Sequence, residues 1–257
     1  MIKGPFIALF LLGIVFINIL FMNSARAESD LIAVAAEHPM LQYQENDEIK
    51  GPSAEILKLL LQTSELEAPL DLLPWSRAYH TVLNRKNTLV VSMVRTQARE
   101  EQFHWLIKVS ELVRGFISLK SKPENSIRTI SEAKSKTIIV IRDSYGHHSL
   151  MNLGFSENTN LYVVSTLKHG IALFLSGKVD LIYTDPNVLT DYFIEHQQDS
   201  EALITVHILP ETRRESYIAA NINTDIGTLE KLNLAANKLQ TDPNYQYYLA
   251  FKALIKK

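Results

Sequence analysis

Arg99 is the residue whose type and setting most clearly suggest chemistry. It lies in the stretch "VSMVRTQAREEQFHW" (residues 91–105), just after an apolar run and three residues past Thr96. A guanidinium is planar and can bind a carboxylate or a phosphate through two parallel hydrogen bonds. The alternative is a solvated arginine at the start of a charged helix, because Glu100 and Glu101 follow it directly.

Two predicted helices begin with polar residues. Ser144 and Tyr145 fall where a helix is expected to start, and there the hydroxyl and free backbone N–H groups could hold an anion. Asp185 precedes Pro186, and this pair is typical of an N-cap followed by the first residue of a helix. Such a cap contributes about 1 kcal/mol without any ligand.

Other candidate site residues are aromatic or titratable. Trp75 and Tyr79, in "LPWSRAY", provide large rigid surfaces that could cover a ligand or stack on its charge. Burial in the core is the alternative for the tryptophan. Glu37 follows the first predicted strand and could face a ligand or pair with an arginine. Arg95 is the better candidate for an arginine on the surface.

Catalytic and metal-binding motifs are missing from the sequence. It contains no G-x-S-x-G, no G-x-x-x-x-G-K-S/T and no H-E-x-x-H. His147 and His148 are adjacent, so on a helix they would point about 100° apart and would not share a metal ion without further ligands. We therefore predict no catalytic residue, no metal and no cofactor.

The chain begins like a secretory signal peptide. Lys3 is followed by an apolar run at 6–22 and by the small-x-small ending Ala25-Arg26-Ala27. We expect residues 1–27 to be cleaved and the rest to be periplasmic, and a retained membrane anchor is the competing interpretation. No later segment of the sequence is apolar enough to span a bilayer.

Composition limits the classes of partner. The 257 residues include 26 basic and 28 acidic side chains, for a formal net charge of −2. Nucleic-acid binding needs a cationic footprint, so we exclude it. The sequence has no cysteine, and a chain of this length can instead depend on a hydrophobic core.

Strand and helix patterns alternate along the first part of the chain. Short apolar runs that end before turn residues predict strands, and 3.6-residue periodicity predicts helices. We expect Ser53 to cap the first helix. The predicted strands are 31–36, 69–75 and 87–94, and the predicted helices are 53–64 and 76–86.

The same alternation continues to the end of the chain. It predicts an α/β fold with a mainly parallel sheet and helices on its faces. The segment 114–122 is expected to be an extended connection, and 126–136 a helix or turn. Further strands are predicted at 137–142, 161–165, 179–184 and 215–223, and further helices within 143–155 and at 166–178, 185–197, 228–242 and 243–257.

Four segments together resemble the family 3 periplasmic solute-binding proteins, the amino-acid type of bacterial extracellular receptors. They occur in the family's order and span most of the chain. The arginine segment and the G-x-x-D segment are fairly specific as a pair. The four segments are "HPMLQYQENDEIKGPSAEILKLL", "SMVRTQAREEQFHW", "IVIRDSYG" and "SGKVDLIYTDPNVL".

The resemblance implies a two-lobed fold of the type II periplasmic-binding-protein kind, with a cleft and two hinge crossings near 112–114 and 214–217. Lobe 1 would comprise 28–112 plus 217–257, and lobe 2 would comprise 113–216. The family further implies a monomer that captures a small zwitterionic or carboxylate solute, with an amino acid as the expected ligand. Its expected partner is an ABC-type permease.

The resemblance also assigns roles to residues. Arg99 matches the arginine that holds a ligand carboxylate, with Thr96 beside it in the motif, and Ser92 matches a small polar residue that faces the ligand. A serine bonded to the backbone is the ordinary alternative for Ser92. Asp185 matches a carboxylate that accepts from a ligand ammonium, and Asp143 stands where the family more often has glycine.

Two other functions are consistent with the same scaffold. One is a dehydratase-like enzyme, which would need a titratable group beside the ligand, and Glu37 and His147 are the candidates. The other is a sensory domain that reports the ligand to a membrane partner.

Overall fold

The structure is a computed structural model that describes residues 31–254, with side chains described for 31–250. The predicted signal peptide, 1–27, lies outside the described residues. The segment from Leu31 onward forms one compact unit by its contacts. Among the described residues, no helix is both long enough and apolar enough to cross a membrane.

One mixed sheet runs through this unit, in the order β4-β1-β5-β10-β6-β9-β7-β8. Four neighbouring pairs are parallel, and the three antiparallel pairs all include β6 or β10. The sheet strands are β1 (Ile32–Ala35), β4 (Leu70–Leu72), β5 (Thr88–Val94), β6 (Phe103–Leu119), β7 (Ile138–Ile141), β8 (Leu161–Val164), β9 (Leu181–Thr184) and β10 (Leu203–Asn221).

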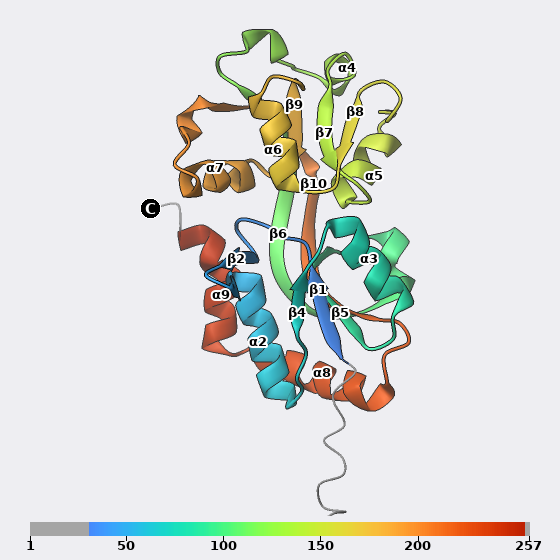
Figure 1. Cartoon of the computed structure of the whole chain (residues 1–257). Helices are drawn as coiled ribbons and strands as arrows, with labels where there is room; N and C mark the ends of the chain where they lie inside the picture. Colours follow the sequence, from blue (N-terminus) through green and yellow to red (C-terminus); the bar gives the residue numbers. More distant parts are fainter. Residues whose placement is uncertain (1–30, 255–257) are drawn as a thin grey trace, which may run out of the picture. The chain divides into compact units, whose positions relative to one another are not determined.

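The helices form two groups, one around each end of the long strands β6 and β10 (Figure 1). A separate hairpin, β2 (Tyr43–Glu45) and β3 (Glu48–Lys50), forms where we expected only a polar loop. One group of helices is α2 (Pro52–Ser64), α3 (Trp75–Asn84), α8 (Ile226–Leu239) and α9 (Pro243–Leu254). The other is α4 (Ile130–Ala133), α5 (Tyr145–Asn152), α6 (Leu167–Leu175) and α7 (Pro186–Glu195).

The long strands β6 and β10 pair with each other from one group of elements to the other (Figure 1). Their register shifts between Leu209 and Arg214. Gly115 allows the two backbones to approach closely, because a Cβ there would lie 3.0 Å from the carbonyl oxygen of His207. The predicted crossings at 112–114 and 214–217 lie within these strands, and the lobe boundaries stay a prediction.

Each group has its own apolar core. In the first, α2 packs against α8 and α9 over the sheet, and Ile56, Leu60 and Tyr245 are buried there. In the second, Phe174 and Phe193 pack on the opposite side of the sheet from Phe116. Apolar burial of roughly 25 cal/mol per Å² holds each group together, so each can support one wall of a site.

Two predicted details are wrong. Ser53 does not cap α2; Gly51 is the N-cap and Pro52 is the first helical residue. Gly51 has φ of 108°, and a Cβ there would lie 2.5 Å from the Leu41 carbonyl oxygen, so glycine is required on both counts. Trp75, which we placed at the end of a strand, is the first residue of α3, after Pro74 at the N-cap.

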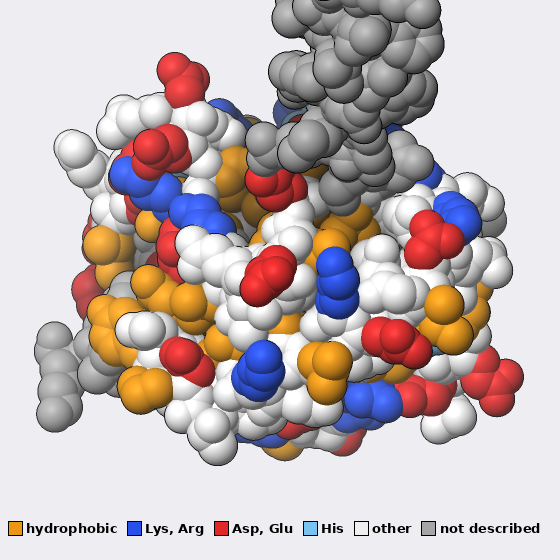
Figure 2. Space-filling model, turned by 90° about the horizontal axis from the view of Figure 1, so that it is seen from below, with side chains coloured by type: hydrophobic (Ala, Val, Ile, Leu, Met, Phe, Trp, Pro, Cys, Tyr) orange, Lys and Arg blue, Asp and Glu red, His pale blue; other side chains and the backbone are white. Residues whose placement is uncertain are grey.

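Figure 2 shows one face of the molecule, on which acidic and basic side chains are interspersed among hydrophobic ones. Helix α8 carries two prominently exposed aliphatic side chains, Ile226 and Leu234. Single exposed apolar residues are normal on soluble proteins.

Candidate functional site

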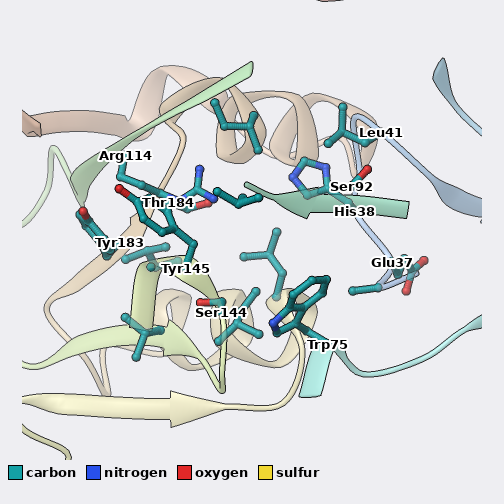
Figure 3. Close-up of a pocket in the computed structure, with 18 of the residues that line it drawn as sticks. Glu37, His38, Leu41, Trp75, Ser92, Arg114, Ser144, Tyr145, Tyr183 and Thr184 are labelled. Atoms are coloured by element: carbon teal, nitrogen blue, oxygen red, sulfur yellow. The ribbon is translucent and has the colours of Figure 1, made fainter. Parts of the chain in front are cut away.

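A pocket of about 120 Å³ lies where the two groups of elements meet at the sheet. This is small beside the roughly 300–1,000 Å³ of sites for drug-sized ligands, so only a small solute would fit. Its walls come from the ends of β1, β5, β7 and β9, the middle of β6 and the start of α5 (Figure 3). Six of the predicted site residues line it: Glu37, Trp75, Ser92, Arg99, Ser144 and Tyr145.

Arg99 is buried, with 5% of its surface exposed. It lies in a 3-10 helix, Gln97–Gln102, that follows β5. Its Nη1 donates to the Val94 carbonyl oxygen and its Nη2 donates to the Asp143 carbonyl oxygen, each at 3.2 Å. Burial lowers the pKa of its guanidinium, although the charge of the Asp143 carboxyl works in the opposite direction.

Aromatic rings hold the Arg99 guanidinium in place. Its central carbon lies 4.9 Å from the ring centre of Tyr79 and 5.7 Å from that of Trp75. These two rings stack on each other with centres 6.0 Å apart. A guanidinium has five N–H donors. Two are used in the bonds to carbonyl oxygens, and the Tyr79 side chain is a further hydrogen-bonding neighbour. The remaining donors are shared between Tyr79 and a ligand.

The Asp143 carbonyl joins the two walls of the pocket. It accepts from Arg99 and also from Trp75 Nε1, at 2.9 Å. Asp143 has φ of 57°, a left-handed conformation that favours glycine. The family pattern has glycine more often here, and the aspartate adopts the backbone that a glycine would. Its carboxylate Oδ2 lies 3.9 Å from His80 Nε2.

Ser92 lies in the pocket wall at a β-bulge. The pairing of β5 with β10 shifts register there, and Ser92 has φ of 62°. Its hydroxyl donates to Gln42 Oε1 at 2.8 Å, and Gln42 Nε2 donates to the Ala36 carbonyl oxygen at 2.8 Å. The hydroxyl therefore binds a side chain rather than the backbone, with its lone pairs still able to accept.

We expect Ser92→Gly to be more stable than Ser92→Ala by about 1 kcal/mol. Both variants lose the bond to Gln42, but only alanine keeps the left-handed strain of roughly 1–2 kcal/mol, while glycine adds a smaller entropic penalty in the unfolded chain. Chemical denaturation of the two variants side by side measures the difference. Equal stabilities would show that the bulge relaxes when the hydroxyl is removed.

The start of α5 forms another wall of the pocket. Ser144 is its N-cap and accepts from the backbone N–H of His147 at 3.1 Å, as the predicted helix start requires. Tyr145 and Gly146, the first two helical residues, also line the pocket. Backbone N–H groups at these positions have no acceptor within a helix and attract anions.

Thr96 and Asp185 are not among the residues that line this pocket. Thr96 borders a neighbouring cavity, together with Arg99 and Tyr145. Asp185 is 1% exposed and caps α7, as its position before Pro186 predicted. Its Oδ1 accepts from Asn187, and its Oδ2 accepts from the backbone N–H of Val113 in β6, at 3.0 Å. Its carboxylate thus ties α7 to the long strand.

Glu37 lies at the other side of the pocket and is exposed. It also borders a larger adjoining cavity of about 460 Å³, with Glu195 and His196 of α7. Figure 3 shows Glu37 and Arg114 at opposite ends of the pocket. The carboxylate is therefore placed at the entrance rather than in the interior.

Arg114 is a cationic lining residue that the sequence analysis did not predict, and the polar lining residues Gln42 and Thr184 were not predicted either. We predicted the segment of Arg114 as a plain extended connection, and the structure places it in the middle of β6. Its side chain extends toward the centre of the pocket, above Tyr145 (Figure 3). The available signal was an arginine within the apolar strand "LVRGFISL", where a buried cation needs a reason.

His147, the other candidate acid or base, does not line the pocket. It is 3% exposed, and its Nδ1 accepts from the backbone N–H of Asp143 at 3.3 Å. Its Nε2 lies 3.1 Å from Glu157 Oε1. Both ring nitrogens thus have neighbours within the protein. Among the described residues, no cluster of three or more metal-ligating side chains is found.

Sequence comparison adds nothing to this description. No family model matches the chain, and no curated protein matches it with significance.

Solved structures do match its fold. The arginine-, lysine-, histidine-binding protein ArtJ of Geobacillus stearothermophilus is 17% identical with a TM-score of 0.72, over 88% of this chain and 96% of that one. A Streptococcus pneumoniae amino acid ABC transporter substrate-binding protein bound to L-arginine is 15% identical with a TM-score of 0.70, over 87% and 93% of the two chains.

A third match is a histidine kinase sensor domain described as similar to periplasmic binding proteins. It is 14% identical with a TM-score of 0.73, over 87% of this chain and 96% of that one. At these identities the likeness shows the fold. This chain has the two-lobed periplasmic-binding-protein fold, as the sequence resemblance predicted.

Proposed function

We propose that this protein is a solute-binding protein of the family 3 type, which captures a small carboxylate-bearing solute between its lobes. The observation that carries the proposal is the small pocket where the lobes meet, with the buried Arg99 in its wall. Within the proposed lobe 1, the guanidinium is fixed by the Val94 carbonyl and by the rings of Tyr79 and Trp75. It is therefore largely oriented for a carboxylate before the ligand arrives.

The proposed site comprises Arg99, Ser92, Ser144, Tyr145 and Trp75, with Glu37 at the entrance. Arg99 would bind the carboxylate, and Ser92 would turn its hydroxyl from Gln42 Oε1 to donate to the same carboxylate. The start of α5 would complete the anion site from the other lobe. Thr96 and Asp185 would act indirectly, Thr96 by starting the 3-10 helix of Arg99 and Asp185 by fixing β6.

Closure of the lobes would complete the site. We propose lobe 1 at 28–112 plus 217–257 and lobe 2 at 113–216, with bending at 112–114 and 214–217 where β6 and β10 pass between them. The bonds of Trp75 and Arg99 to the Asp143 carbonyl would then form only when the lobes close. Removing water from the cleft strengthens every charged contact within it.

The localisation and the partner follow from the resemblance and the similar structures. The signal-like start of the sequence supports a periplasmic location. The likeness to a substrate-binding protein of an amino acid ABC transporter supports delivery of the solute to an ABC-type permease. We propose binding rather than catalysis, because His147 is buried outside the pocket, where its Nδ1 accepts from the backbone N–H of Asp143.

A thermal-shift screen over amino acids, small peptides and organic acids tests the proposed function. A solute at 100 times its Kd stabilises the folded state by about 2.7 kcal/mol, which for a chain of this size raises Tm by roughly 5–11 °C. Solutes without a carboxylate serve as the control. If no carboxylate raises Tm, the proposed function is wrong. A solute that is chemically changed after long incubation, seen by NMR, would favour the enzyme instead.

A further inference from the structure

Two guanidinium groups and one carboxylate line the pocket, and the carboxylate lies at its edge. Arg99 and Arg114 supply the cations, and Glu37 supplies the only acidic side chain among the described lining residues. Glu37 is exposed and lies at the opposite end of the pocket from Arg114 (Figure 3). The interior therefore carries an excess of positive charge.

The hydrogen bond that fixes Arg114 is made by its backbone and not by its guanidinium. Its backbone N–H donates to Thr212 Oγ1 at 2.9 Å. Its guanidinium carbon lies 5.9 Å from the ring centre of Tyr145, where the ring face attracts it. Within the described part of the chain, its guanidinium has no hydrogen bond and no ion pair within 4.0 Å. Burial lowers the pKa of this guanidinium, with the charge of Asp185 partly opposing the effect.

Neither cation is neutralised by direct contact with a carboxylate. The two hydrogen bonds of Arg99 go to backbone carbonyls. Arg99 is buried and Arg114 is half-buried. A charge removed from water without a partner is destabilising, and two cations in one small pocket also repel each other. A ligand with two negative charges would remove both penalties at once, whereas a ligand with one would leave the second arginine unpaired.

The apolar part of the lining indicates what connects those charges. Side chains of Val91, Val94, Leu112, Ile139 and Ile182 line the pocket and suit a short aliphatic spacer. The lining also has neutral polar groups, such as those of Gln42 and Thr184, but its one carboxylate is that of Glu37 at the edge. Asp185, the predicted acceptor for an ammonium, is turned to Val113 and Asn187 instead.

We propose that the solute is a short dicarboxylic acid, with one carboxylate on Arg99 and the other on Arg114. This inference rests on the proposed function and names the class of solute. Arg114 is then the residue that selects for the second acidic group, with the Tyr145 ring and the start of α5 beside it.

Calorimetry with succinate and butyrate tests this, because the two differ by one carboxylate on the same four-carbon chain. We expect succinate to bind the wild-type protein at least tenfold more tightly than butyrate. Arg114→Met should weaken the binding of succinate at least tenfold and change the affinity for butyrate by no more than about threefold. Loss of a half-buried charge without an ion pair should leave the melting temperature of the ligand-free variant unchanged or raised.

Arg214→Met is the matched control. The guanidinium carbon of Arg214 lies 5.8 Å from the same Tyr145 ring, but Arg214 does not line the pocket. This variant should keep the preference for succinate. If it loses that preference as fully as Arg114→Met does, the effect comes from Tyr145 or from the proposed hinge at 214–217, and the assignment to Arg114 is wrong.

The remaining outcomes separate this inference from the proposed function. Equal binding of succinate and butyrate by the wild type, or tight binding of neutral amino acids with none of succinate, would overturn the dicarboxylate inference and leave the proposed function standing. If the wild type binds glutamate and Arg114→Met binds it with the same affinity, the dicarboxylate inference is also overturned. If no carboxylate binds at all, the proposed function itself fails.

Discussion

Replacing Arg99 with lysine should weaken solute binding by roughly 30-fold, or about 2 kcal/mol. The fork of Arg99 bonds the Val94 and Asp143 carbonyls and still has donors for a ligand. An ammonium is a point charge with three donors, so it cannot serve both carbonyls and a bidentate carboxylate. It also lacks the planar face that stacks on Tyr79 and Trp75.

Arg95→Lys is the control for this prediction. Arg95 lies four residues earlier, is partly exposed and bonds Glu100 on the surface, as we predicted for a surface arginine. Its replacement should change affinity less than twofold, because surface ion pairs contribute little. Calorimetry with the best solute from the thermal-shift screen measures both variants. Wild-type affinity in Arg99→Lys would remove Arg99 from the site.

Asp185→Asn should lower the free energy of unfolding by about 1–3 kcal/mol. The sequence alone suggests almost no change in stability, because asparagine caps a helix about as well as aspartate does. The structure gives a different expectation, because both carboxylate oxygens accept from backbone N–H groups, one of Asn187 and one of Val113. An amide has one oxygen, so its NH₂ group would face one of these buried donors.

Asp199→Asn is the matched variant for this measurement. Asp199 caps a short 3-10 helix in an exposed position and accepts from the backbone N–H of Glu201. Its replacement should lower the free energy of unfolding by less than about 0.5 kcal/mol. Urea denaturation compares the two. If Asp185→Asn is as stable as the wild type but binds the solute at least tenfold more weakly, the carboxylate belongs to the ligand site after all.

The sequence predicted the short buried strands and most helices because their burial leaves a periodic pattern. The first half of β10 has no such pattern. Its residues from Leu203 to Arg214 are mostly exposed or half-buried, since this part of the strand lies against β6 with one face open. The stretch "TVHILPETRR" therefore looks like a polar loop. Only the later, buried half, which we placed at 215–223, was predicted as a strand.

Part of the pocket lining was predictable where a residue follows a strand or starts a helix. Arg99, Ser144 and Tyr145 occupy such positions, and all three line the pocket. Ser92, inside β5, was predicted from the family resemblance and also lines it. Arg114 lies inside a strand, so its position in the site depends on which strands are neighbours of β6. Sequence patterns do not determine that order.

Asp185 shows the limit of assigning a role from position alone. The residue before it, Thr184, lines the pocket, and Asp185 does not. Successive residues of an extended chain point to opposite sides, so a motif can be in the expected place while its side chain points elsewhere. Here the hydrogen bond to Val113 in β6 determines the direction.

The position of β10 in the sheet has a consequence for how the chain folds as it is synthesised. β10 lies between β5 and β6, so the edge of β5 has no partner until residue 221 has been made. The apolar side of α2 stays uncovered for longer still, because α8 and α9 come last.

The segment from β7 to α7, in contrast, is continuous in the sequence and can pack as soon as it is complete. Folding thus proceeds from the middle of the chain outward. Until β10 and the last helices are made, the segment made first has an unpaired edge at β5 and an exposed apolar face on α2. Such features lead nascent chains to aggregate. Contacts at such large sequence separation also form slowly, so this part of the fold depends most on protection before the chain is finished.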